Sequence, residues 1–304
     1  MLKNNFPYLA PVRKMNMPLI PHRHAQAAAN APVLPVHSHK KMTAAQNIEL
    51  IKEWLRHFAR KNGWSDENCP KMLQVKMTHT LRVADDCKNI SVELGWDKEK
   101  TFAAEAAGLL HDIARFPQFN KYKTFLDRDS FDHGEYAYNI LCQEDPLKNI
   151  NIAIHTREAI LAAVRFHNRK HIPEGLNGFS LDLLKLVRDA DKLDILMVVR
   201  DVAENDDYDN HPELLLGKEK NGPPTKELID EILKTKSGSY EKVHSLADLN
   251  LLRLTWVYDI NYKPSLKRLK KRELYRDLMA YRDTNPDIEE IKRQVKNFLN
   301  LNTD

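Results

Sequence analysis

The sequence has little of what marks a secreted, disulfide-bonded or membrane-spanning protein. Its 304 residues include three cysteines, Cys69, Cys87 and Cys142, whose spacing matches neither a zinc-ligand pair nor a disulfide framework. The longest apolar runs are short and broken by charge, as in 193–199 between Lys192 and Arg200, whereas a membrane helix needs about 20 apolar residues. These absences predict a protein without a transmembrane span, in a reducing compartment, and the cytoplasm is the simplest address.

Acidic residues are missing from the start of the chain, where the first is Glu49. Residues 1–42 also contain six prolines and no sustained helical period, which predicts a disordered or extended segment outside the core. A transit peptide is the alternative, but the sparse arginine favours a flexible tail or an upstream start. The segment's histidines are adventitious metal binders at most, and they are His22, His24, His37 and His39.

Neither sign of charge dominates the chain, which has 47 basic and 43 acidic residues and a formal net charge of +4. This balance does not predict nucleic-acid binding. Both a monomer and an oligomer fit the sequence. The basic run at 263–276 is typical of a solvated helix surface, which we favour over a phosphate- or RNA-binding face.

Apolar residues make up 42% of the chain and recur at helical spacing from Thr43 onward. Thr43 and Gln46 have the spacing of a capping box, so a first helix is expected from there to near Gly63. A second helix is expected after Pro70 and before Gly95. The pattern predicts an all-α protein.

A third helix is expected to begin at the capping residue Asp97 and to hold His111 and Asp112 in its final turns. It should break before Pro117, because proline interrupts a helix. A polar, aromatic connection is then expected over 115–130.

A further helix should start near Asp132, another should end near His167, and a long one should run from the capping residue Ser180 to about 203. Residues 205–304 are expected to form three more helices without internal repeats. The predicted organisation is a catalytic domain at 43–204 and a helical extension packed on it.

Six ionisable side chains fall on or near the apolar stripes of these helices. Burying such a group costs several kcal/mol unless a partner or a metal compensates, and one alone would indicate only a hydrogen-bonded core residue. Their joint occurrence indicates a metal centre, because neutral imidazole and carboxylate together suit Mn²⁺, Fe or Zn²⁺. The six are His79, His111, Asp112, His133, His167 and Asp191.

Three segments carry most of these residues: MTHTLRVA at 77–84, GLLHDIARF at 108–116 and RDADKLD at 188–194. They resemble the HD-domain phosphohydrolases, whose metal ligands occur in the order His, His-Asp, Asp. Residues 115–134 also look like a subgroup of uncharacterised bacterial HD hydrolases. The resemblance covers roughly residues 72–204 and implies an HD-domain helical bundle with additional C-terminal helices. It makes the primary ligands His79, His111, Asp112 and Asp191, and it adds His133 and His167 as in binuclear members.

The resemblance further implies a metal-dependent phosphohydrolase that acts on a nucleotide or other small phosphoester through metal-activated water. Phosphomonoesterase, phosphodiesterase and nucleotidase activities all fit, with one or two divalent ions of Mn, Fe, Zn, Ni or Co, and Mg as a further candidate. Asp112 is expected to bridge two ions, and Arg115 and Lys192 to neutralise charge on the phosphoryl oxygens, with Arg82 as a further cation. The Gly-Tyr-Pro of cyclic-dinucleotide phosphodiesterases does not follow His167, which disfavours that substrate class. No membrane partner is expected.

Some assignments have alternatives. Asp189 competes with Asp191 for the last ligand position, and we prefer Asp191 because its neighbours on the helix are apolar. His155 is expected to be structural or substrate-facing. Four aromatic residues could form a base-stacking wall, although loop packing is favoured, and they are Phe116, Phe119, Tyr122 and Phe125.

Other functions are also open. An HD-fold di-iron oxygenase would use the same six ligands. A non-catalytic nucleotide-sensing module would not need them all. A nuclease would fit the basic pI of about 8.7, but it is disfavoured by the balanced charge.

Overall fold

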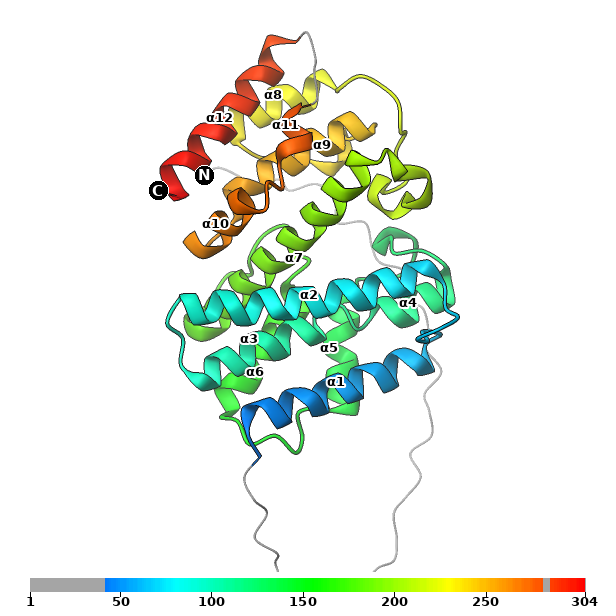
Figure 1. Ribbon diagram of the computed structural model, residues 1–304, viewed down its shortest axis with the longest axis vertical. Coiled ribbons are helices and arrows are strands. Elements are labelled where there is room, and N and C mark those ends of the chain that lie inside the picture. Colours follow the sequence, from blue (N-terminus) through cyan, green and yellow to red (C-terminus); the bar gives the residue numbers. More distant parts are fainter. Residues whose placement is uncertain (1–41, 281–284, 304) are drawn as a thin grey trace, which may run out of the picture. The chain divides into compact units, whose positions relative to one another are not determined.

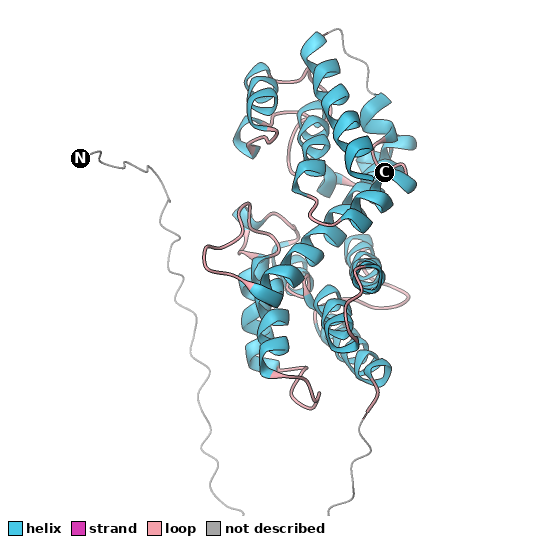
Figure 2. Cartoon of the chain, turned by 90° about the vertical axis from the view of Figure 1, so that its left-hand side faces the viewer, coloured by secondary structure: helices cyan, strands magenta, loops and turns pink. Residues whose placement is uncertain are grey.

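The computed structural model describes residues 42–280 and 285–303, where the regular elements are helices (Figure 2). The predicted all-α fold is confirmed. Within this part of the chain, strand-like pairing is limited to one isolated bridge between Glu219 and Ser245. The segment predicted to be disordered, with its histidines, lies outside the described residues except for Met42.

The long helix α7 joins two groups of helices (Figure 1). The first group and α7 itself comprise α1 (Ala44–Lys61), α2 (Lys71–Glu93), α3 (Lys98–Leu110), α4 (Arg115–Tyr122), α5 (His133–Glu144), α6 (Ile154–Phe166) and α7 (Gly178–Glu204). The second group comprises α8 (Lys226–Thr235), α9 (Leu246–Thr255), α10 (Lys263–Lys271), α11 (Arg276–Ala280) and α12 (Pro286–Thr303). Among the described helices, none is long and apolar enough to cross a membrane.

The predicted helix starts at the N-terminal end of the chain are confirmed by their caps. The Thr43 hydroxyl accepts from the backbone N–H of Gln46 at 3.2 Å, and the Gln46 side chain accepts from the N–H of Thr43 at 2.9 Å. The carboxylates of Asp97 and Asp132 likewise accept backbone N–H groups at the starts of α3 and α5. Each cap satisfies a donor that has no partner within the helix.

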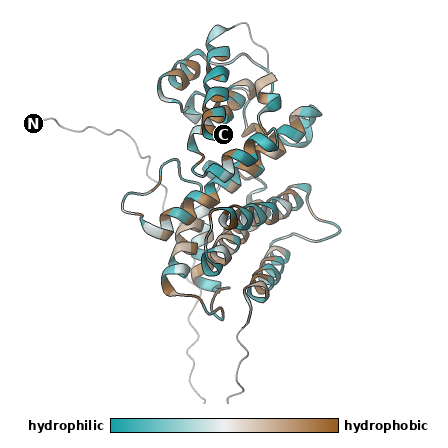
Figure 3. Cartoon of the chain, turned by 60° about the vertical axis from the view of Figure 1, so that its left-hand side comes forward, coloured by the Kyte–Doolittle hydropathy of each residue, from teal (hydrophilic) through white to brown (hydrophobic). Residues whose placement is uncertain are grey.

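Helices α2 and α3 pack at very short range, and both also contact α7. A Cβ atom added at Gly108 on α3 would lie 2.6 Å from the Cα of Ala84 on α2, so only glycine permits this approach. The apolar side chains of the helices share one core, and their polar residues lie on other faces (Figure 3). The close packing places the end of α3 beside the middle of α2.

The predicted irregular connection at 115–130 is wrong in its first half, because residues 115–122 form α4. Pro117 is the third residue of α4, and the first backbone N–H groups of a helix have no partner within it, so proline is tolerated there. The preceding helix therefore ends at Leu110, and His111 and Asp112 lie in the turn before α4 rather than in the final turns of α3.

Two other helix predictions are also corrected. The long helix begins at Gly178, two residues before the predicted cap Ser180. The C-terminal part holds α8 to α12 instead of three helices, because left-handed backbone at Lys236 (φ 59°) and Glu273 (φ 51°) interrupts the helical path.

The C-terminal helices are tied to the first group by buried charges. Arg272, just after α10, donates twice to the carboxylate of Asp86 on α2, at 2.6 Å each. Asp189 on α7 accepts from the backbone N–H groups of Asn261 and Tyr262, which precede α10. These contacts join the two ends of α10 to α2 and α7.

Candidate metal centre

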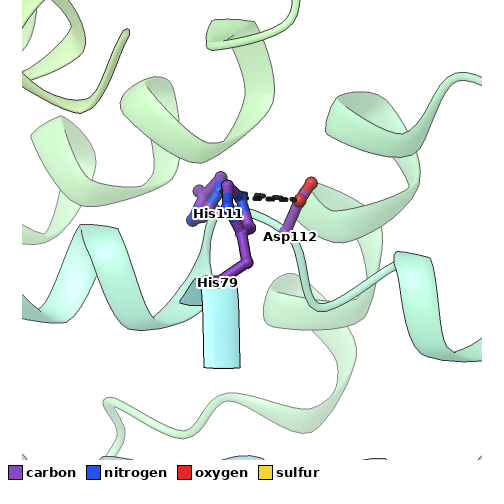
Figure 4. Close-up of side chains that lie close together, drawn as sticks. All are labelled: His79, His111 and Asp112. Atoms are coloured by element: carbon purple, nitrogen blue, oxygen red, sulfur yellow. Dashed lines mark hydrogen bonds and ion pairs between the residues drawn. The ribbon is translucent and has the colours of Figure 1, made fainter. Parts of the chain in front are cut away.

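The structure brings the six predicted ligands together from five elements of the first group. They are His79 within α2, His111 and Asp112 directly after α3, His133 at the first position of α5, His167 directly after α6, and Asp191 within α7. All are buried except Asp191, which is partly exposed. Figure 4 shows how His79 on α2 and the His111–Asp112 turn approach each other.

Two of the histidines are held by main-chain carbonyls. The Nδ1 of His111 lies 2.7 Å from the carbonyl oxygen of Gly108, and the Nδ1 of His167 lies 2.8 Å from that of Val164. A carbonyl oxygen can only accept a hydrogen bond, so each Nδ1 carries the proton. Each Nε2 is therefore left with its lone pair facing the cluster.

The other two histidines are held by carboxylates in the same way. His79 donates from Nδ1 to Asp194 at 2.6 Å, and His133 donates from Nδ1 to Asp127 at 2.6 Å. Such partners fix the tautomer and the ring orientation of metal-binding histidines. All four Nε2 atoms consequently face the cluster.

Asp112 lies between two pairs of these nitrogens. Its Oδ2 is 3.4 Å from Nε2 of His79 and 3.6 Å from Nε2 of His111. Its Oδ1 is 3.5 Å from Nε2 of His133 and 3.6 Å from Nε2 of His167. One carboxylate thus offers a different oxygen to each pair, which is the arrangement of a bridging ligand.

The two pairs of nitrogens are poorly satisfied by protein atoms alone. The Nε2 atoms of His79 and His111 are 3.3 Å apart, and those of His133 and His167 are 3.1 Å apart. Facing lone pairs repel each other unless a proton or a cation lies between them. The Oδ1 of Asp112 is also buried without a hydrogen-bond partner. Both features fit a site for cations.

Three sets of donor atoms within 4.8 Å of one another could hold a metal ion. Two of them share Asp112 and take one histidine pair each, and the third joins His111 and His167 to Asp191. An imidazole and carboxylate set of this kind suits Mn, Fe, Zn, Ni or Co better than a purely oxygen-bound ion such as Mg.

The two candidates for the last ligand position, Asp191 and Asp189, have different neighbours in the structure. Asp191 Oδ1 lies 3.2 Å from Nε2 of His79 and 3.8 Å from Nε2 of His111. Asp189 is fully buried and accepts from Asn261 instead. The structure therefore places Asp191 in the cluster and Asp189 outside it, as the apolar stripe predicts.

The electrostatics of the cluster favour neutral His111 and His133 beside an ionised Asp112. Burial lowers the pKa of His111 to about 4, and burial together with the charge of Arg115 lowers the pKa of His133 to about 4. Burial opposes the charge on Asp112, but Lys76 and the histidines hold the pKa of this carboxyl well below its usual range. His111, His133 and Asp112 are thus in the protonation states that metal binding requires.

His79 differs from the other histidines. Burial acts to lower its pKa, but hydrogen bonds to Asp112, Asp191 and Asp194 outweigh burial and raise it to about 10. Three carboxylates therefore favour a positive charge at the inner nitrogen of this ring, which is the position where a cation would lie.

The three cations predicted to bind phosphate have different carboxylate partners in the structure. Arg115 lies at the cluster, with Nε 3.4 Å from Oδ1 of Asp112 and Nη1 donating to Asp127 at 2.9 Å. Lys192 instead pairs with Asp259 at 2.9 Å, in the turn before α10. Arg82 donates to Asp194 through two nitrogens. Arg115 alone of the three contacts a predicted ligand.

Lys76 was not predicted, although its ammonium lies closer to the carboxylate of Asp112 than the guanidinium of Arg115 does. Its Nζ lies 2.7 Å from Oδ2 of Asp112. The sequence does contain a clue, because Lys76 is one helical turn before His79 and so shares its face of α2. Asp194 and Asp127, which orient His79 and His133, were also assigned no role from the sequence.

The remaining candidates lie away from the metal ligands or pack in the loop. His155 is exposed near the start of α6. Phe116 is fully buried, and Phe119 and Phe125 pack on each other with ring centroids 5.3 Å apart. The ring of Phe125 also faces Lys76, whose Nζ is 5.5 Å from its centroid. The Phe125 ring therefore faces two cations of the site, Lys76 and Arg115.

Comparison with known families agrees with this geometry. The model of the HD domain matches residues 77–196, a range that contains all six predicted ligands. A search of the curated proteins gave no match.

Proposed function

Because the chain belongs to the HD-domain superfamily through residues 77–196, we propose that it is a metal-dependent phosphohydrolase with a binuclear centre. The observation that carries the proposal is Asp112, whose two oxygens each face one pair of imidazole nitrogens. This arrangement supports one ion held by His79 and His111, a second held by His133 and His167, and Asp191 as a further ligand.

The proposed reaction is hydrolysis of a phosphoester. When bound, cations of this class would lower the pKa of a coordinated water toward about 7 and so supply a nucleophile at neutral pH. The protein's own part is to hold the ligands rigidly, and the four Nδ1 hydrogen bonds do this from the side away from the cluster.

Arg115 is suited to neutralising charge on the phosphoryl oxygens. Its Nη1 is fixed by Gln118, by the carbonyl of Phe125 and by Asp127, whereas its Nε is buried without a hydrogen-bond partner near Asp112. A preorganised guanidinium with a free donor can bind developing negative charge without reorganisation. We assign no such role to Lys192, because its ammonium is paired with Asp259.

The substrate class that we propose is a nucleotide or another small phosphoester. A small substrate fits a centre whose ligands are almost all buried, since only Asp191 is partly exposed. The aromatic face of Phe125 next to the cations offers a surface on which a base could stack.

A metal and substrate screen tests the proposal. The purified protein is analysed for metal content, reconstituted with Mn²⁺, Fe²⁺, Zn²⁺, Ni²⁺, Co²⁺ or Mg²⁺, and assayed for phosphate release from nucleotides and an aryl phosphate without O₂. We expect metal-dependent phosphate release that Asp112→Ala abolishes. Oxygen consumption by the iron form, without phosphate release from any substrate, would establish the oxygenase alternative instead. Retained turnover in Asp112→Ala would refute catalysis through this centre.

A further inference from the structure

Lys76 places a positive charge beside the predicted ligand Asp112. It lies on α2, one turn before His79, and its ammonium is 2.7 Å from Oδ2 of Asp112. Its side chain is 17% exposed, so the group is neither deeply buried nor freely solvated. It also sits over the ring of Phe125, at 5.5 Å from the centroid.

The oxygen bound by Lys76 is the one that the first metal ion would use. Oδ2 of Asp112 is the oxygen that faces Nε2 of His79 and of His111. An ammonium and a divalent cation at one carboxylate oxygen repel each other strongly in a partly buried site. A metal ion would therefore weaken the hold of Asp112 on Lys76, and an added anion would relieve the repulsion.

Two other cations around the centre, Arg82 and Lys192, do not contact Asp112. Arg82 is held by Asp194, and Lys192 is held by Asp259, and neither carboxylate belongs to the predicted ligands. Metal binding leaves both of these ion pairs intact. Lys76 differs from these two cations because its carboxylate partner is itself a predicted ligand of both ions, and it differs from Arg115, which faces Oδ1 of Asp112, because it pairs with Oδ2.

We propose that Lys76 is a catalytic residue that binds the substrate's phosphoryl oxygens once the first metal position is filled, an inference that rests on the proposed function. In the metal-free protein the same ammonium substitutes for the cation at Asp112. Two consequences follow with opposite signs: loss of the Lys76 charge removes a competitor of the metal, and it removes a binding partner of the phosphate. A purely structural Lys76 would instead support Asp112, and its loss would weaken metal binding.

The test uses the full chain with Lys76→Met and Lys76→Gln, and Lys88→Met as a matched control on the same helix. Lys88 pairs with Glu105, away from the centre. Lys76→Gln keeps a hydrogen-bond donor for Asp112 if the methionine variant does not fold. Titration calorimetry measures the affinity for Mn²⁺, then the affinity of the Mn²⁺-loaded protein for inorganic phosphate, and aryl phosphate hydrolysis gives kcat/KM.

We expect both neutral variants to bind Mn²⁺ at least as tightly as the wild type and inorganic phosphate at least about tenfold more weakly. Their kcat/KM should fall by at least the same factor, whereas Lys88→Met should match the wild type. Lys76→Arg keeps the charge and should retain phosphate affinity within a few-fold. Unchanged phosphate affinity in Lys76→Met or Lys76→Gln overturns the proposal, and so does a weaker affinity for Mn²⁺. If no phosphoester is hydrolysed but the wild type still binds phosphate more tightly than these variants, the proposed function fails while the anion site at Lys76 stands.

Discussion

Asp189 and Asp191 lie two residues apart in α7, yet their carboxylates serve different parts of the molecule. Asp189 accepts from the backbone N–H of Asn261 at 2.9 Å, from the Asn261 side chain at 2.9 Å, and from the N–H of Tyr262 at 3.0 Å. Asp191 faces His79 at 3.2 Å. Residues two apart on a helix point in nearly opposite directions, so one helix carries both a structural and a metal-facing carboxylate.

This division predicts that the same substitution has different effects at the two positions. Asp189→Ala leaves buried N–H groups without an acceptor and should lower the free energy of unfolding by about 3 kcal/mol. Asp191→Ala should lower the affinity for Mn²⁺ sharply and change the stability of the metal-free protein much less, because Asp191 is only partly buried among other carboxylates. Urea unfolding in the presence of a chelator and metal titration measure the two quantities. The reverse pattern would show that Asp189 is the ligand.

The choice between these two aspartates shows how far the sequence alone can go. The apolar neighbours of Asp191 at helical spacing predict that it faces inward, and the structure places it beside His79. The role of Asp189 could not be predicted, because its donors come from Asn261 and Tyr262, some 70 positions later in the chain. Helical periodicity identifies a buried face, but it does not identify what covers that face.

Asp194 should control the affinity of the first ion without touching it. It accepts from Nδ1 of His79 at 2.6 Å and from two nitrogens of Arg82. The charge of Asp194 orients this imidazole and increases its basicity. Because Asp194→Asn removes that charge, we expect metal affinity to fall by about 10- to 100-fold. Asp201→Asn, on the exposed face of the same helix, is the control and should bind metal as the wild type does. Equal metal affinity in Asp194→Asn and Asp201→Asn would contradict a positioning role for Asp194.

The close approach of α2 and α3 should matter for both stability and metal binding. A Cβ atom added at Gly108 would lie 2.6 Å from the Cα of Ala84, so Gly108→Ala must push the helices apart. We expect a loss of about 1–3 kcal/mol in the free energy of unfolding and weaker Mn²⁺ binding, because His79 and His111 separate with their helices.

Gly95→Ala provides the comparison for Gly108→Ala. Gly95 has a φ of +72° and open space around it, so alanine there costs about 1 kcal/mol of backbone strain without moving the ligands. Thermal unfolding and metal titration of both variants separate the two effects. If Gly108→Ala loses stability but binds Mn²⁺ normally, the helix spacing does not set the geometry of the centre.

Predictions from the sequence succeeded where local chemistry decides and failed where distant residues decide. The caps at Thr43 and Asp97 follow from side chains three residues from their partners, and they are confirmed. Lys192 was predicted to bind phosphate because it follows Asp191 in the sequence. In the structure its ammonium forms an ion pair with Asp259, in the turn before α10. A neighbour in sequence on a helix points elsewhere, and a residue one turn away, such as Lys76, shares the face.

Removal of bound metal ions should lower the melting temperature of the protein. In two pairs, the Nε2 atoms lie 3.3 Å and 3.1 Å apart, and Oδ1 of Asp112 is buried without a hydrogen-bond partner. Bound cations would reduce the repulsion between these atoms in the folded protein. A ligand that binds only the folded state stabilises it by about 2.7 kcal/mol when its free concentration is about 100 times Kd. A chelator should therefore lower the melting temperature of the wild type by roughly 5 °C or more. Asp112→Ala, which loses the ligand shared by both ion positions, should melt at the same temperature with and without the chelator, and added Mn²⁺ should not raise it. A wild-type melting temperature that is unaffected by both chelator and Mn²⁺ would show that these six side chains do not hold an ion, whatever their proximity.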